Sequence, residues 1–151
     1  NALCTKSIIS FYEESEKNLD KVLKIFIRVN SGGTQLSYSD LLMSILTANF
    51  STDIRDMMQK LVEAFRDKGF GVLGRDQILK SCLLLTGCSH IFNLKNFSKT
   101  NISKIEENWD RITTSLYDAT QIVEDFGYAY QLSTAYIISI IALYLYNNDK
   151  R

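Results

Sequence analysis

The sequence predicts an all-α protein, an irregular bundle of about six helices with at most one short extended segment. The chain has 151 residues and no proline, so it lacks the residue that most often breaks helices. Its apolar residues recur at intervals of three and four along most of the chain, which is the period of one helical face. No two stretches alternate apolar and polar residues well enough to form a sheet of their own.

The first two predicted helices flank a glycine-containing loop. Residues 18–29 carry one apolar face and end at the Asn30-Ser-Gly-Gly run, whose residues tolerate the positive φ at which helices stop. A second helix is predicted to begin near Tyr38. The hydroxyl of Ser37 can accept a hydrogen bond from a first-turn N–H, and Asp40 follows three residues later, which is an N-cap signature.

The next two predicted helices are separated by a glycine-spaced turn. Residues 53–66 carry the clearest amphipathic pattern in the chain, and Gly69 follows as the residue at which this helix stops. Residues 77–86 are predicted to form a short, largely buried helix ended by Gly87. Residues 91–97 fit a strand and a loop equally well.

The last two predicted helices complete the bundle. Thr100 or Asn101 is predicted to cap one long helix that runs to Val123, with Gly127 just past its end. Residues 133–146 are apolar nearly all round, which in a water-soluble chain predicts a helix buried among the others. This apolar stretch is shorter than a membrane span, so we expect no membrane segment.

Composition excludes several classes of protein. Hydrophobic residues make up 46% of the chain, far above the content of disordered tails. Its 17 Lys and Arg residues balance 17 Asp and Glu residues, so contact with DNA or an anionic membrane would need a local patch. Three cysteines, Cys4, Cys82 and Cys88, are too few and odd in number for a disulfide framework, and we therefore expect a cytoplasmic protein.

A basic stripe precedes the glycine loop. At about 100° per residue, Lys17, Lys21, Lys24 and Arg28 fall on one side of the helix predicted over 18–29, opposite its apolar face. The loop adds backbone N–H groups and the hydroxyls of Ser31 and Thr34, so it could hold an anionic group. No lysine follows its second glycine, so it is not a Walker A loop. An ordinary surface helix followed by a connector explains the same pattern.

One segment resembles a known family. The run Phe26-Ile-Arg-Val-Asn-Ser-Gly-Gly-Thr, followed by Leu36-Ser and Asp40-Leu, is similar to the F-x-R-x-N-S-G-G-T-x-L-S segment of domain-of-unknown-function family 262. The best-known members of that family are the GmrSD-type modification-dependent restriction proteins. Weaker similarities continue through residues 78–83, 93–97 and 105–109 and the apolar end of the chain.

The resemblance implies that the chain is the helical middle region of a larger bacterial defence protein. In that family a ParB and sulfiredoxin-like N-terminal domain carries an Asp-Gly-Gln-Gln-Arg motif linked to nucleotide hydrolysis, and an HNH nuclease domain often follows. This sequence contains neither motif. We therefore expect residues 3–151 to be a single helical domain without catalytic residues or a cofactor of its own. Because the chain begins without an initiator methionine, we expect Asn1-Ala2 to be a remnant of tag cleavage. A nucleoside triphosphate and a divalent metal would belong to the parent protein.

The resemblance also implies partners and contact residues. The expected partners are the ParB-like and nuclease domains of the parent, and DNA, with no membrane. By analogy Arg28 and Asn30 would make polar contacts, while Gly32 and Gly33 would allow close backbone approach. The full set predicted to contact phosphate, nucleotide or DNA is Lys21, Lys24, Arg28, Asn30, Ser31, Gly32, Gly33 and Thr34. Two other roles stay open for the region, a non-enzymatic module binding DNA backbone or a partner domain through the basic stripe, and a purely structural segment.

Other groups of chemically active residues give weaker signals. Cys82, Cys88 and His90, even with Cys4, match no zinc-ligand spacing, and Cys82 is better explained as a core residue. Glu106, Glu107 and Asp110 surround Trp109, but carboxylates on an exposed helix turn are usually only solvated. Most aromatic residues at helical spacing are core or interface anchors more often than platforms for nucleic-acid bases. Those in question are Trp109, Tyr117, Tyr128, Tyr130, Tyr136, Tyr144 and Tyr146.

Overall fold

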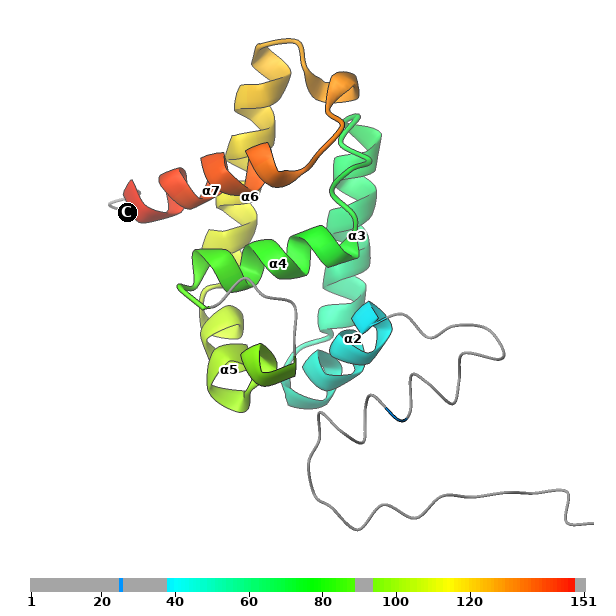
Figure 1. Cartoon of the computed structure of the whole chain (residues 1–151), viewed down its shortest axis with the longest axis vertical. Coiled ribbons are helices and arrows are strands. Elements are labelled where there is room, and N and C mark those ends of the chain that lie inside the picture. Colours follow the sequence, from blue (N-terminus) through cyan, green and yellow to red (C-terminus); the bar gives the residue numbers. More distant parts are fainter. Residues whose placement is uncertain (1–24, 26–37, 89–93, 149–151) are drawn as a thin grey trace, which may run out of the picture. The chain divides into compact units, whose positions relative to one another are not determined.

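The computed structural model describes residue 25, residues 38–88 and residues 94–148. Residues 37–151 form one compact unit and residues 1–36 another, and all but one of the described residues belong to the first. These residues form six α-helices and two short 3-10 helices, without a strand among them (Figure 1). The all-α prediction is confirmed for this part of the chain. The helix predicted over 18–29 and the cap at Ser37 lie outside the described residues.

Three helices end just before the glycines at which the sequence predicted them to stop. Gly69, Gly87 and Gly127 have φ values of +88°, +70° and +79°, the left-handed conformation that commonly ends helices. They follow the helices over Ile54–Asp67, Arg75–Leu85 and Trp109–Asp125 respectively. In chain order the elements are α2 (Tyr38–Asn49), α3 (Ile54–Asp67), α4 (Arg75–Leu85), η3 (Leu94–Phe97), α5 (Lys99–Glu107), α6 (Trp109–Asp125), η4 (Ala129–Gln131) and α7 (Tyr136–Asn148).

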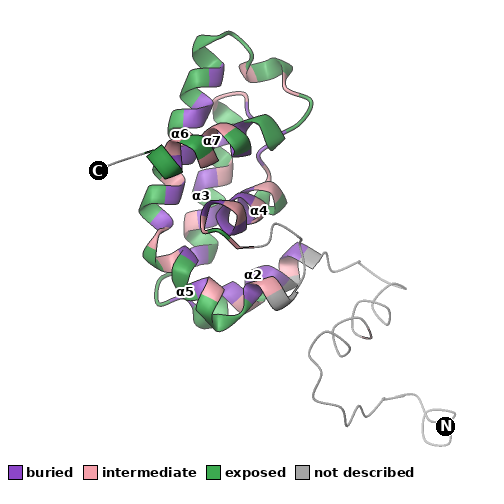
Figure 2. Cartoon of the chain, turned by 60° about the vertical axis from the view of Figure 1, so that its left-hand side comes forward, coloured by how far each residue is buried: buried purple, intermediate pink, exposed green. Residues whose placement is uncertain are grey.

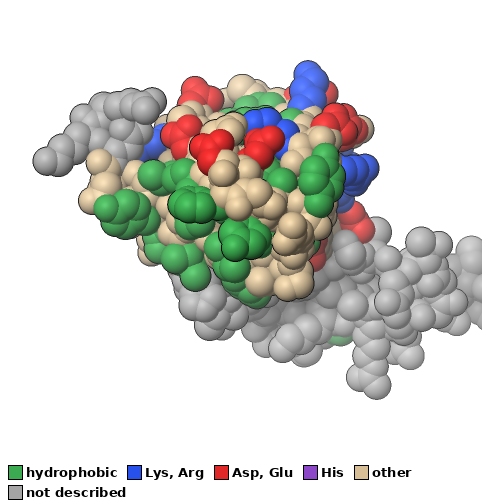
Figure 3. Space-filling model, turned by 90° about the horizontal axis from the view of Figure 1, so that it is seen from above, with side chains coloured by type: hydrophobic (Ala, Val, Ile, Leu, Met, Phe, Trp, Pro, Cys, Tyr) green, Lys and Arg blue, Asp and Glu red, His purple; other side chains and the backbone are tan. Residues whose placement is uncertain are grey.

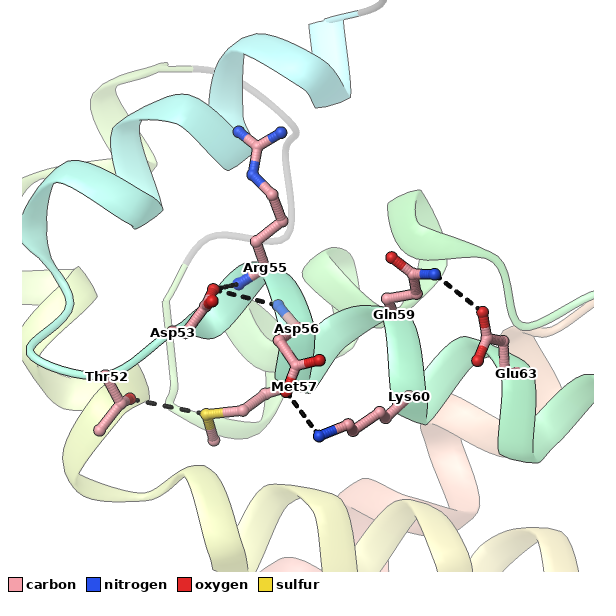
Figure 4. A network of polar contacts seen from close by, with 8 residues as sticks. All are labelled: Thr52, Asp53, Arg55, Asp56, Met57, Gln59, Lys60 and Glu63. Carbon is pink, nitrogen blue, oxygen red and sulfur yellow. Dashed lines mark hydrogen bonds and ion pairs between the residues drawn. The ribbon is translucent and has the colours of Figure 1, made fainter.

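Helix α3 confirms the amphipathic pattern. Asp53 caps it, because its Oδ1 accepts hydrogen bonds from the backbone N–H groups of Arg55 and Asp56, both at 3.1 Å. On the outer side Lys60 pairs with Asp56 at 2.6 Å, as Figure 4 shows. The inner side buries Ile54, Met58, Leu61 and Phe65. The helix is therefore defined by its cap at one end, Gly69 beyond the other, and one apolar face.

The long helix predicted from residue 100 to residue 123 is wrong, because α5 and α6 are separate helices that meet at Asn108. The amide of Asn108 donates to the carbonyl of Lys104 at 2.8 Å and accepts from the hydroxyl of Tyr146 at 3.0 Å. Such side-chain bonds compete with the helical backbone ladder. The predicted cap was also misplaced, since Ser98 is the N-cap and its Oγ accepts from the backbone of Asn101 at 3.4 Å.

Helix α7 corrects a second prediction, because it is not buried all round. It packs on α6 and α4 with one side, which includes Ile138, Ser139 and Ala142. Its other side is open to solvent, with exposed fractions of 47–67% at Tyr136, Ile137, Ile140 and Tyr144. Figure 2 shows exposed residues along this helix. Two neighbours cover only part of a helix, so uniform hydrophobicity did not imply complete burial.

A small polar cluster lies inside the apolar contact between α4 and α7. The hydroxyl of Ser139 accepts from the side-chain amide of Gln77 at 2.9 Å and lies 2.9 Å from the hydroxyl of Ser81. Ser81 and Ser139 are 0% and 2% exposed. Buried polar groups need partners, and these three side chains satisfy one another.

Residues 91–97 were predicted to form a strand or a loop. The part of this stretch that the structure describes forms the 3-10 helix η3 (Leu94–Phe97).

Candidate functional site

The predicted contact residues, Lys21, Lys24, Arg28, Asn30, Ser31, Gly32, Gly33 and Thr34, all lie outside the described residues. The described part of the family-like segment is its C-terminal end. Ser39 is buried there and Leu42 is wholly buried. Because Leu42 anchors the start of α2 in the core, the end of the segment is a fixed part of the helical unit.

Two polar contacts join the start of α2 to the start of α4. A guanidinium nitrogen of Arg75 lies 2.9 Å from Oδ1 of Asp40, and the hydroxyl of Ser39 donates to the carboxylate of Asp76. Helix α4 has Gly74 as its N-cap, which provides no side-chain hydrogen bond, so Asp76 supplies the negative charge that favours a helix N-terminus. The two residues of the segment therefore bind the two residues that begin α4.

These contacts fix geometry more than they add stability. The side chains of Arg75 and Asp40 are 48% and 43% exposed, and exposed ion pairs contribute about 0–1 kcal/mol. Arg75 and Asp40 lie 35 residues apart in the sequence, and Ser39 and Asp76 lie 37 residues apart. The pair of contacts thus sets the position of one helix start relative to the other.

A polar hollow lies beside these contacts, which we call the Arg75 groove. It has a volume of about 520 Å³, adjoins a smaller hollow of about 140 Å³ and shares Gln59 and Arg75 with it. Arg66 lines the larger hollow and Arg55 the smaller one, and neither makes an ion pair with a described residue. The side chain of Arg55 points away from Asp53 and Asp56 (Figure 4). The lining of the larger hollow is Ser39, Gln59, Val62, Glu63, Arg66, Gly74, Arg75 and Asp76.

The Arg75 groove has the chemistry of a binding surface. Guanidinium groups present a fork of donors that matches phosphate and carboxylate oxygens. The larger hollow also contains two carboxylates. Glu63 accepts a hydrogen bond from Gln59 at 2.9 Å and Asp76 accepts one from Ser39, and these neutral donors leave both negative charges in place. The sequence analysis did not single out Arg55 and Arg66, although their spacing places them on one face of α3. No local spacing brings Arg75 of α4 beside them.

Only some of the cysteines and aromatic residues singled out in the sequence lie in the core. Cys82 is fully buried, and burial raises the pKa of its thiol to about 12, so it is a neutral core residue, as expected. No cluster of three or more potential metal ligands occurs among the described residues, while Cys4 and His90 lie outside them. Trp109 and Tyr146 are buried, and Tyr117 packs on Phe65. Trp109 and Tyr146 therefore belong to the core and Tyr117 is partly buried. The expectation of a core position is wrong for the other four tyrosines, which are exposed: Tyr128, Tyr130, Tyr136 and Tyr144.

The acidic residues beside Trp109 do include one with a specific partner. Glu106 accepts hydrogen bonds from the hydroxyl and the backbone N–H of Ser51, at 2.6 and 2.7 Å. These bonds hold the pKa of Glu106 below its ordinary value of 4.5. The carboxylate therefore links α5 to the connection between α2 and α3.

We expect this link to make stability depend on pH. A carboxyl group with a lowered pKa in the folded state stabilises it fully above the unfolded pKa, and this contribution is lost as the pH falls through the folded pKa. The loss should begin near pH 4.5 and continue below it. Urea unfolding between about pH 3 and pH 7 checks this. Glu106→Gln should flatten the profile, whereas Glu107→Gln, at an exposed neighbour, should not. Equal profiles for both variants would contradict the assignment.

The chain matches no protein-family model and no curated protein. Among the described residues, no helix combines the length and the hydrophobicity needed to cross a membrane.

Proposed function

We propose that residues 3–151 form the helical region of a bacterial, nucleoside-triphosphate-dependent and DNA-directed restriction or anti-phage defence protein of the GmrSD type, inactive alone. The observation that carries this proposal is the segment from Phe26 to Leu42. Its F-x-R-x-N-S-G-G-T-x-L-S pattern specifies the residue type at nine positions. The all-α architecture of the described residues agrees with a helical region that supports such a segment.

Within this proposal the helical unit holds the end of the segment in place. Ser39 and Asp40 bind the start of α4, so the chain leaves the unit from a defined point. Upstream, Arg28 and Asn30 would contact phosphate, and Gly32 and Gly33 would let the backbone approach it. The nucleotide and its divalent metal would be held mainly by the ParB-like domain, and cleavage would belong to the nuclease domain.

A second role, a non-enzymatic module that binds DNA backbone, is favoured by the open arginines. Arg55 and Arg66 have no ion-pair partner among the described residues and line adjoining hollows. The basic stripe of Lys17, Lys21, Lys24 and Arg28 would supply further contacts. In this role the region would bind DNA without nucleotide.

Salt dependence of DNA binding tests the contact residues. Each phosphate contact contributes about 0.9 to the slope of log affinity against log salt. We therefore expect Lys21→Gln with Arg28→Gln to lower affinity for a short duplex and reduce the slope by about 2. Lys60→Gln with Lys104→Gln removes the same charge from exposed positions on α3 and α5 and should leave the slope unchanged. An unchanged slope in the first variant would contradict DNA contact by the stripe.

A nucleotide readout separates the two roles. With the ParB-like domain present, Asn30→Ala should lower nucleotide hydrolysis and leave the salt slope of DNA binding as it was. Full turnover in that variant would remove the nucleotide role and leave the DNA-binding module.

A further inference from the structure

The open side of α7 is strongly apolar and uncharged. Tyr136, Ile140 and Tyr144 lie four residues apart on one line of the helix, with exposed fractions of 60%, 64% and 67%. We call this line the Tyr144 ridge. Helix α7 contains no Asp, Glu, Lys or Arg. Such a ridge has nothing to attract a phosphate backbone and nothing to repel another apolar surface.

A groove runs beside the ridge, between α7 and the end of α6. It has a volume of about 430 Å³ and an apolar lining that includes Ile122, Phe126, Tyr128, Leu132, Ile137 and Ile141. Ile137 is 47% exposed, and it connects the groove with the open side of α7. Seen from the end of the molecule where α6 and η4 lie, hydrophobic side chains gather on one side (Figure 3). A ridge and a hollow therefore occur side by side.

The exposed area is large enough for a stable interface. Phe126 and Tyr128 are 73% and 55% exposed. With the ridge, Ile122 and Ile137 they expose roughly 600–1,000 Å², at roughly 150–250 Å² for each complete side chain of this size. The largest apolar patch of a typical monomer covers about 300–600 Å², and a standard interface takes about 800 Å² from each partner.

We propose that this surface binds a second copy of the chain in a two-fold symmetric dimer. A two-fold contact requires a surface that is complementary to itself. Here the Tyr144 ridge of one copy fits the groove of its partner, and the same contact occurs twice. The lack of charge on α7 favours this occupant, because two identical surfaces meet without repulsion. The tyrosine rings are buried in the contact while their hydroxyls stay at its rim.

Sedimentation velocity tests the dimer. From about 1 to about 100 μM the unaltered chain should pass from the mass of one chain to twice that mass. Ile140→Lys with Tyr144→Lys places charges on the ridge and should keep the chain monomeric throughout. Both side chains are exposed, so circular dichroism should be unchanged. Ala48→Lys with Thr114→Lys adds the same charge at exposed positions on α2 and α6 and should still dimerise.

A milder variant guards against misfolding. Ile140→Ser removes apolar contact without adding charge and should weaken dimerisation by about tenfold or more, since burying an isoleucine is worth about 1.5–3 kcal/mol. A chain that stays monomeric at about 100 μM would overturn the proposal. It would do so even if the same surface were found to bind a different protein. A dimer that survives the ridge substitutions would also overturn it.

Discussion

Replacing Phe65 by alanine is expected to lower the free energy of unfolding by about 3–5 kcal/mol. The ring is 0% exposed on the inner side of α3, and its centroid lies 4.9 Å from that of Tyr117 on α6, with the rings inclined at 50°. The substitution removes this contact and leaves a cavity that the fixed helix backbones cannot fill. Domains have total free energies of unfolding of about 5–15 kcal/mol, so this loss is a large share of the total stability.

Phe126→Ala is the matched control, because it makes the same chemical change at a ring that is 73% exposed. We expect it to change stability by less than about 1 kcal/mol. Urea unfolding followed by circular dichroism, at a dilution where the chain is monomeric, measures both variants. Equal losses in the two variants would contradict the placement of Phe65 between α3 and α6.

The Ser139→Ala variant is expected to lose about 1–3 kcal/mol, the usual cost of leaving a buried polar group without its partner. Its hydroxyl accepts from Gln77 at 2.9 Å and contacts Ser81 at 2.9 Å. Ser81 keeps its bond to the backbone of Gln77, but the side-chain amide of Gln77 loses the acceptor. The contact between α4 and α7 is weakened as a result.

Ser44→Ala is the control for this prediction. Among the described residues, its exposed hydroxyl bonds to the carbonyl of Asp40 in the same helix, at 2.9 Å, and to no other group. Alanine favours helices. We expect its change to lie within about 0.5 kcal/mol of zero. Thermal unfolding measures the stability of both variants relative to the unaltered chain. A Ser139→Ala variant as stable as the unaltered chain would show that the cluster does not join α4 to α7.

Local patterns in the sequence predicted much of the fold. Helix α3 was predictable because its apolar spacing and Gly69 lie within one short stretch. The break at Asn108 was not, because it depends on the hydroxyl of Tyr146, which lies 38 residues away. The open side of α7 was missed for a related reason. Hydrophobicity shows what a helix can bury, whereas the number of neighbours decides what it does bury.

The candidate site divides in the same way. The resemblance of the segment from Phe26 to Leu42 could be noticed because its residues lie close together in the sequence. Its attachment to Arg75 was not, because the two residues come from helices 35 positions apart. The Arg75 groove combines Arg55 and Arg66, which share one face of α3, with Arg75 of α4, which no local spacing brings beside them. Long-range contacts of this kind are fixed by packing, not by local spacing.

Titration of the unaltered chain with a short DNA duplex, repeated at increasing salt, tests the central claim most directly. If the basic stripe contacts phosphates, log affinity should fall linearly with log salt, with a slope of roughly −2 to −4 for two to four contacts. Saturable binding with that slope would support a DNA-directed helical region. Absence of binding at low salt, or an affinity that does not change with salt, would contradict it.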